Sequence, residues 1–198
     1  LELARSDSVY EGMATKFFQH FVYIANALVN NDNRDVQNWD DKDGFFYDVL
    51  SINKKHQQIK VRSLVGLIPL FPVDCITEED LNSFKEFAES FKWFFGNRSD
   101  VCQHCVTPIT ENGKTKYLLT LMDVGKIKRV LSYAWDSNEF RSSYGLRSLS
   151  KFYEKNPYEL LGSSINYQPG EATAILKGGN SNWRGPIWFP TSFLFIEA

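Results

Sequence analysis

Apolar and polar positions alternate along this chain in blocks that predict helices separated by aromatic loops. Between Val9 and Leu28, apolar residues recur at steps of three and four. That spacing predicts an amphipathic helix from about residue 8 to residue 30, with a broad buried face. Ser8 and Glu11 have the spacing of a capping box at its start.

A second helical stripe follows the sequence Thr77-Glu78-Glu79-Asp80, which is typical of a helix N-terminus. Leu and Phe residues continue at helical spacing from Leu81 to Phe95, and Gly96 is placed to end the helix. We expect these rings to lie in the core.

The middle of the chain has shorter patterns. Asp43-Gly44 predicts a turn, followed by a strand or extended segment over residues 45–52. Residues 59–71 are a nearly continuous apolar stretch that holds one arginine, Arg62, which either pairs with a carboxylate or faces a polar pocket. Lys116–Met122 predicts a short strand and Val124–Leu131 a short helix.

The last third is rich in loops from residue 151 to residue 177, and then becomes apolar from Trp188 to Ile196. This final run predicts a buried helix with Pro190 near its first turn. Helical stripes separated by long aromatic loops predict a toroid of helical hairpins.

Composition supports one sizeable core in 198 residues, of which 43% are hydrophobic and 15% aromatic. The chain begins without Met, and its last residues, Phe193–Ala198, belong to the predicted final helix. We therefore expect residues 1–198 to form one domain that is part of a longer protein and is truncated at both ends.

Charge and hydropathy exclude some classes of partner. The net charge is −2, with 22 basic and 24 acidic residues interspersed, which gives no electrostatic footprint for nucleic acid. No apolar run reaches the length of a membrane span, and no signal peptide is visible. An odd number of cysteines favours a reducing compartment, so we expect a cytoplasmic protein without a membrane partner.

Cys102-Gln103-His104-Cys105 is the segment with the clearest metal-ligating residue types. A zinc site needs four ligands, and no second pair with zinc spacing follows. The favoured interpretation is a loop that carries two thiols, with zinc as the alternative. We expect neither a metal nor another cofactor.

The most unusual composition is found in residues 178–190, which contain two Trp, three Gly, two Asn, two Pro and an Arg. Glycine allows a tight turn or close approach to a ligand, and proline stiffens the segment. Indole rings beside planar hydrogen-bonding groups suit a sugar, whose C–H faces stack on aromatic rings. The alternative is a tight turn whose two Trp close a core.

The segment Tyr144–Ser150, followed about thirty residues later by Asn182-Trp183-Arg184-Gly185-Pro186-Ile187-Trp188, resembles the paired signature of glycoside hydrolase family 63. That family includes α-glucosidase I and mannosylglycerate hydrolases. Residues 1–28 and 44–71 also resemble a cytosolic, glucosidase-like branch of it. The resemblance covers nearly the whole chain.

The resemblance implies an all-α fold, an (α/α)6 barrel of six helical hairpins, here incomplete and with long loops and short strands. It also implies an inverting hydrolase that cleaves an α-glucosidic or α-mannosidic bond with one general acid and one general base. Both positions would lie outside residues 1–198. Glu139, Asp48 and Glu171 do not stand where the family places its catalytic pair, and a structural role is favoured for them.

What the resemblance carries over to this chain is a sugar pocket. It implies that Trp183 and Trp188 line the subsite of the cleaved sugar and that Gly185 permits close approach. Arg184 would clamp a loop carboxylate, and Asn182 stands where some relatives have Tyr. Tyr144 and Arg147 would shape the pocket wall. The expected partner is an oligosaccharide or a small glycoside; the alternative is a non-catalytic carbohydrate-binding or scaffold protein.

Overall fold

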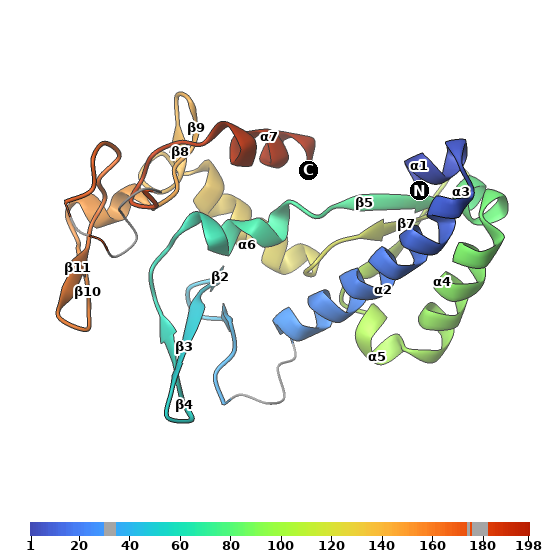
Figure 1. The fold of residues 1–198 in the computed structure, drawn as a ribbon, viewed down its shortest axis with the longest axis horizontal. Helices are drawn as coiled ribbons and strands as arrows, with labels where there is room; N and C mark the ends of the chain where they lie inside the picture. Colours follow the sequence, from blue (N-terminus) through green and yellow to red (C-terminus); the bar gives the residue numbers. More distant parts are fainter. Residues whose placement is uncertain (30–34, 174, 176–181) are drawn as a thin grey trace. The chain divides into compact units, whose positions relative to one another are not determined.

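The computed structural model describes residues 1–29, 35–173, 175 and 182–198. The chain forms two compact units. Unit 1 comprises residues 1–33 and 72–123, and unit 2 comprises residues 34–71 and 124–198. The two units are described separately below (Figure 1). That the whole chain belongs to one truncated domain stays a prediction.

In the described residues of unit 1, five helices pack through aromatic side chains. The long helix α2 (Val9–Val29) contacts α4 (Lys85–Asn97) and α5 (Ser99–Cys102), and runs beside α4 in Figure 1. Phe18 of α2 lies 5.2 Å from Phe91 and 5.8 Å from Phe87 of α4, measured between ring centroids. The shorter helices are α1 (Glu2–Ser6) and α3 (Glu78–Ser83).

The predicted first helix has the expected bounds, but its buried face is narrower than predicted. Phe18, Val22 and Ala25 are buried, whereas Val9 and Phe17 are exposed. The capping box expected at its start is replaced by other contacts: the Asp7 carboxylate accepts the amide of Val9 at 3.0 Å, and Glu11 accepts the amide of Phe87 at 3.1 Å.

The second predicted helix is divided in two. Thr77 and Asp80 form a capping box at the start of α3, as the sequence indicated. Phe84 then adopts extended geometry between α3 and α4 and is itself buried. Most of the rings of α4 are core as expected, although Phe95 is 39% exposed.

Unit 1 also holds an antiparallel three-stranded sheet in the order β5-β7-β6, formed by β5 (Asp74–Thr77), β7 (Lys114–Leu119) and β6 (Val106–Glu111). Strands β6 and β7 join through Asn112 and Gly113, both with positive φ. An Asn-Gly pair in that conformation forms a two-residue hairpin whose twist matches the strands.

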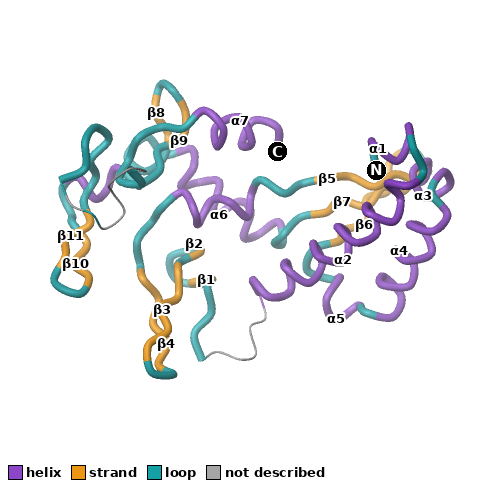
Figure 2. The backbone as a smooth tube through the Cα atoms, viewed as in Figure 1, coloured by secondary structure: helices purple, strands orange, loops and turns teal. Residues whose placement is uncertain are grey.

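Unit 2 is built mostly from loops and short strands (Figure 2). The strands that the structure describes in this unit form four two-stranded antiparallel sheets. The pairs are β1 (Trp39–Asp40) with β2 (Phe45–Phe46), β3 (Asp48–Ile52) with β4 (Lys55–Ile59), β8 (Arg141–Ser142) with β9 (Gly145–Leu146), and β10 (Tyr158–Leu160) with β11 (Ser163–Ile165).

Helical segments of unit 2 are η1 (Leu64–Leu70), α6 (Val124–Trp135), η2 (Lys151–Glu154) and α7 (Phe189–Glu197). The final helix α7 has the predicted bounds, with a proline in its first turn. It was predicted to be buried, and this is wrong: α7 contains no buried residue, and Phe189 is 82% exposed.

The predicted all-α fold is wrong. Helix accounts for 44% and strand for 24%, which makes this a mixed α/β chain with several small antiparallel sheets. The physical reason lies in the turns, because three of the hairpins have two consecutive positive-φ residues at their tips. These pairs are Asn53-Lys54, Asn112-Gly113 and Leu161-Gly162, and each reverses the chain too tightly for a helix.

Within the described parts of the chain, no helix combines the length and the apolar character needed to cross a membrane.

Candidate functional site

The two motif segments that the sequence singled out lie side by side in unit 2. The amide of Ser148 donates to the carbonyl of Pro186 at 3.0 Å, and the amide of Gly185 donates to Ser148 Oγ at 2.9 Å. Arg147 and Ile187 form an antiparallel bridge. Segments nearly forty residues apart in sequence are therefore fixed against each other by backbone hydrogen bonds.

Trp183 and Trp188 form an edge-to-face pair. Their ring centroids lie 4.2 Å apart with an interplanar angle of 84°. Both side chains are half-buried, so each indole keeps part of its surface accessible. Two half-exposed rings at right angles form a corner, and a sugar ring can stack on one indole while its edge meets the other.

Arg184 lies between these two tryptophans in sequence but is fully buried. Its guanidinium donates to Asn166 Oδ1 at 2.5 Å, to the carbonyl of Ser164 at 2.9 Å and to Gln168 Oε1 at 3.4 Å. Burial lowers its pKa. These three hydrogen bonds end on amide and carbonyl oxygens, so they lend no support to the prediction that Arg184 clamps a loop carboxylate.

Gly185 and Asn182 hold in place the backbone that carries the indole pair, and we call this backbone the seat of the pair. Gly185 has φ +131°, and a Cβ there would overlap the ring of Tyr167. Asn182 donates to the carbonyl of Gln168 at 2.8 Å and to that of Gly170 at 2.6 Å, and its Oδ1 accepts the amide of Arg184. Asn182 therefore anchors the segment, and both its nitrogen and its oxygen are engaged. Residues 178–181 of the predicted stretch lie outside the described residues.

Tyr144 and Arg147, the remaining predicted site residues, differ in their surroundings. Tyr144 lies at the turn between β8 and β9 and is 88% exposed. Arg147 is held by the Tyr167 hydroxyl at 3.2 Å and by the carbonyls of Ser137, Glu139 and Arg141. Arg147 thus braces the loops around Tyr167, and Tyr167 in turn lies against Gly185.

Sequence reasoning left open the role of Arg62, and the structure places it beside motif residues 148–150. The amide of Ser150 donates to the carbonyl of Arg62 at 3.0 Å, and the amide of Leu64 donates to that of Ser148 at 2.9 Å. Segments 62–64, 147–150 and 185–187 are therefore joined laterally in that order. Arg62 belongs to the same backbone arrangement as the indole pair.

The guanidinium of Arg62 pairs with Glu139, with 2.9 Å between Nε and Oε2. Glu139 also accepts a short hydrogen bond from the Ser150 hydroxyl. Burial alone would lower the pKa of Arg62, but Glu139 outweighs it and raises that pKa. Of the two roles left open for Arg62, pairing with a carboxylate is the one that the structure has.

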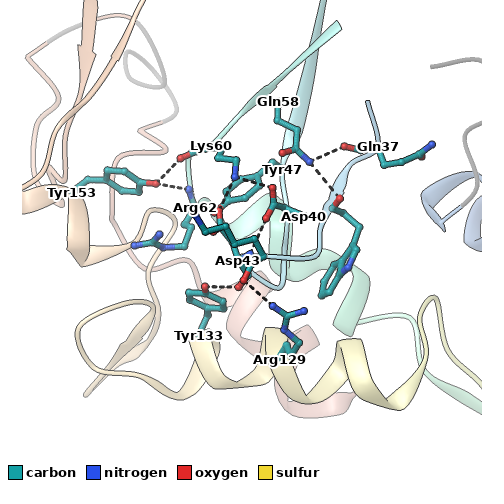
Figure 3. Close-up of polar contacts among 12 residues, drawn as sticks. Gln37, Asp40, Asp43, Tyr47, Gln58, Lys60, Arg62, Arg129, Tyr133 and Tyr153 are labelled. Carbon is teal, nitrogen blue, oxygen red and sulfur yellow. Dashed lines mark hydrogen bonds and ion pairs between the residues drawn. The ribbon is translucent and has the colours of Figure 1, made fainter. Parts of the chain in front are cut away.

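Lys60, Asp40 and Asp43 form a second ionic group near Arg62. Lys60 donates to Asp40 at 2.8 Å and to Asp43 at 3.1 Å, and Figure 3 shows it between the two carboxylates. Burial alone would raise the pKa of Asp40, but the hydrogen bond from Lys60 and nearby backbone amides lower it. Asp43 also accepts the hydroxyl of Tyr47 at 3.1 Å.

Tyrosines tie these groups together (Figure 3). The Tyr153 hydroxyl donates to the carbonyl of Lys60 and accepts the amide of Arg62, both at 2.9 Å. The Tyr133 hydroxyl donates to the carbonyl of Asp43 at 2.7 Å. Burial raises the pKa of Tyr47, Tyr133 and Tyr153, so all three stay protonated and able to donate.

Among the carboxylates considered from sequence, Glu139 has the structural role that was favoured, since it holds an arginine and a hydroxyl. Asp48 and Glu171 are exposed. Neither Asp40 nor Asp43 was assigned to the sugar site, and Asp43 entered the sequence analysis as part of a turn. The signal that could have drawn attention to them is the density of charged residues immediately before an aromatic turn, Asp40-Asp41-Lys42-Asp43-Gly44.

The thiols lie in unit 1. All three cysteines are free, with Cys75 exposed and Cys102 and Cys105 buried. Burial raises the pKa of Cys102, and raises that of Cys105 to about 12. Across the residues that the structure describes, no group of three or more His, Cys, Asp or Glu side chains could hold a metal ion. The zinc alternative therefore gains no support here.

Comparison with known proteins adds one relative. The whole chain aligns with the uncharacterized protein YMR196W of Saccharomyces cerevisiae, at 39% identity over 214 residues. The chain spans about a fifth of the length of this curated relative, since the alignment covers 20% of it. No family model matches the chain, and no solved structure matches it.

Proposed function

We propose that this chain carries the sugar-binding segment of an inverting glycoside hydrolase that cleaves an α-glucosidic or α-mannosidic bond. The general acid and general base would lie outside residues 1–198. The whole alignment covers only a fifth of the yeast relative, which leaves room in a longer protein for both groups.

The observation that carries the proposal is the indole pair. Trp183 and Trp188 stand edge to face at 4.2 Å, are both half-buried, and flank a buried arginine that fixes the backbone between them. A pair that only closed a core would be sealed from solvent. A rigid, partly open aromatic corner costs little conformational entropy when a sugar binds.

The test is the activity of the full-length protein on a panel of α-glucosides and α-mannosides, with Trp183→Ala and Trp188→Ala as variants. We expect either substitution to lower activity by roughly two orders of magnitude or more, because it removes a binding wall that orients the substrate. NMR of the released sugar should show inversion at the anomeric carbon.

Trp135→Ala serves as the matched control. Trp135 is 63% exposed and lines a separate cavity of about 430 Å³ with Phe195 and Leu146. Its removal should leave activity within about twofold of wild type, since it changes no group of the indole corner. Wild-type kinetics in Trp183→Ala and Trp188→Ala would contradict the assignment.

A second function is favoured by one observation. The carboxylates beside the site are already paired, Glu139 with Arg62 and Asp40 and Asp43 with Lys60. A protein that bound carbohydrate without cleaving it would need no free acid or base. Sugar binding without turnover in the full-length protein would support this alternative.

We also propose a cytoplasmic location. The buried Cys102 and Cys105, three positions apart in sequence, are both free thiols, and the third cysteine, Cys75, is free and exposed. Unpaired thiols are typical of proteins kept in a reducing compartment.

A further inference from the structure

We propose that Arg62, Glu139 and Phe152 form a second sugar subsite next to the indole corner, one that accepts an uncharged sugar unit. The ligand would then be at least a disaccharide. This inference rests on the proposed function, since it extends the same site by one sugar. It concerns residues that the family resemblance did not carry over.

The guanidinium of Arg62 is held among aromatic rings, as a group that donates hydrogen bonds to a ligand would be. Its guanidinium carbon lies 4.4 Å from the ring centroid of Phe152, 5.5 Å from that of Tyr133 and 5.6 Å from that of Tyr153. Aromatic faces hold the planar group in place and leave its edge to donate hydrogen bonds. Such a fixed donor costs little entropy when a ligand binds.

Exposure of the group is partial. The side chains of Arg62 and Glu139 are 15% and 13% exposed, whereas Phe152 is 43% exposed. A ligand can therefore stack on the open part of the phenyl ring and reach the edge of the ion pair. Hydrogen bonds in such a partly desolvated place are stronger than those at an open surface.

The charges around this group select the class of ligand. Glu139 balances Arg62, and the adjoining Lys60 is balanced by Asp40 and Asp43. A carboxylate or phosphate placed beside Arg62 would face Glu139, whose carboxylate already neutralises that guanidinium. A sugar hydroxyl both donates and accepts, so neighbouring hydroxyls suit a guanidinium beside a carboxylate.

The position relative to the indole corner also fits a second sugar. Segment 62–64 is hydrogen-bonded to segment 147–150, which is hydrogen-bonded to segment 185–187. The register sets Arg62 level with Ser150 and Trp188 level with Leu146, so two lateral steps of about 4.8 Å and four residues along the segments separate their backbones by roughly 16 Å. Long side chains at both positions shorten that span, and a ligand of two or more linked sugars can cover the rest.

The experiment measures binding by calorimetry in the full-length protein. The probes are glucose, mannose, and thio-linked α-disaccharides of each sugar in every linkage, because the sulfur linkage resists hydrolysis. We expect the best disaccharide to bind at least about tenfold more tightly than its monosaccharide, since it adds a stacking contact and charge-assisted hydrogen bonds.

Substitutions then show which residues account for the tighter binding of the disaccharide. Phe152→Ala and Arg62→Lys should each remove most of the tenfold advantage and leave monosaccharide binding unchanged, whereas Trp188→Ala should weaken both ligands. Lysine keeps the charge but lacks the planar fork. Because Phe152 is exposed, Phe152→Ala decides the matter even where Arg62→Lys fails to fold. Trp135→Ala is the control and should behave as wild type.

Three results would overturn the inference. Disaccharide affinity that is unchanged in Phe152→Ala and Arg62→Lys, while Trp188→Ala weakens binding, would reject the second subsite and leave the proposed function standing. Tighter binding of a disaccharide whose second unit is a uronic acid would reject the uncharged class. Absence of binding by every sugar of both series in the wild-type protein would reject the proposed function and this subsite with it.

Discussion

Aromatic side chains have different surroundings in units 1 and 2. Unit 1 packs rings from helices α2 and α4 into one apolar cluster, with Phe18, Phe87 and Phe91 in mutual contact. Unit 2 surrounds its tyrosines and tryptophans with ion pairs, backbone hydrogen bonds and loop segments.

This difference indicates which unit is better suited to bind a ligand specifically. An apolar helical cluster gains stability from burial and offers few directed polar groups. Loops braced by satisfied polar contacts hold particular side chains at fixed positions, partly open to solvent. The candidate site accordingly lies in unit 2, and the sharpest tests substitute matched residues in each unit.

The largest effect is expected in the core of unit 1. Phe91→Ala removes a ring that is 1% exposed and contacts several others, so we expect a loss of about 3–5 kcal/mol in the free energy of unfolding. Phe95→Ala, one turn further along α4 and 39% exposed, should cost clearly less. Chemical denaturation followed by circular dichroism measures both, and equal losses would contradict this description of the core.

A smaller effect is expected at the seat of the indole pair. Gly185→Ala places a Cβ against the ring of Tyr167 at φ +131°, so we expect a loss of about 2–3 kcal/mol in stability together with weaker sugar binding. Gly170→Ala is the control, because a Cβ there meets nothing within 4 Å. Thermal unfolding and calorimetric titration measure the two effects, and a neutral Gly185→Ala would contradict the tight seat.

Next in size is the cap of α3 in unit 1. Asp80→Asn weakens the capping box and the contact with Arg5, at a cost of about 1 kcal/mol near neutral pH. Burial alone would raise the pKa of Asp80, but hydrogen bonds from Arg5 and Thr77 lower it. A carboxyl whose folded pKa is depressed stabilises the fold above its ordinary pKa of about 4 and loses that contribution as the pH falls through the folded pKa.

The difference between wild type and Asp80→Asn should therefore be constant between about pH 6 and pH 8 and shrink below about pH 4. Denaturation midpoints across this range measure it. A difference that grows as the pH falls would contradict the lowered pKa.

The smallest effect concerns the thiols and needs no stability change. Cys75 is exposed, whereas burial raises the pKa of Cys102 and Cys105. An aromatic disulfide reagent should therefore modify Cys75 rapidly in the native protein, and Cys102 and Cys105 only after unfolding, because the thiolate is the reactive form. Rapid modification of all three in the native protein would show that the two buried thiols are accessible.

Sequence patterns predicted unit 1 better than unit 2 for a physical reason. Helix α2 and the cap of α3 follow from periodicity and local hydrogen bonding, which are encoded within a few residues. The break at Phe84 does not, since burial of that ring in the tertiary fold overrides a continuous helical stripe. The hairpins were missed although Asn112-Gly113 is a strong turn signal.

In unit 2 the motif residues were found, but several of their contacts were not. The juxtaposition of Ser148 with Gly185 and the pairing of Arg62 with Glu139 join segments far apart in sequence, which no local pattern encodes. Arg184 illustrates the limit most clearly. The family resemblance implied a carboxylate partner, whereas its hydrogen bonds to Asn166 and Ser164 end on an amide and a carbonyl oxygen in or next to β11.

The sugar site is tested most directly by NMR of the full-length protein, in which the indole N–H signals of the five tryptophans of residues 1–198 are followed while methyl α-glucoside or methyl α-mannoside is added. Single Trp→Phe variants assign the signals. We expect the signals of Trp183 and Trp188 to shift together, with one dissociation constant, while those of Trp39, Trp93 and Trp135 stay in place. Sugar binding that leaves the Trp183 and Trp188 signals unmoved would contradict it.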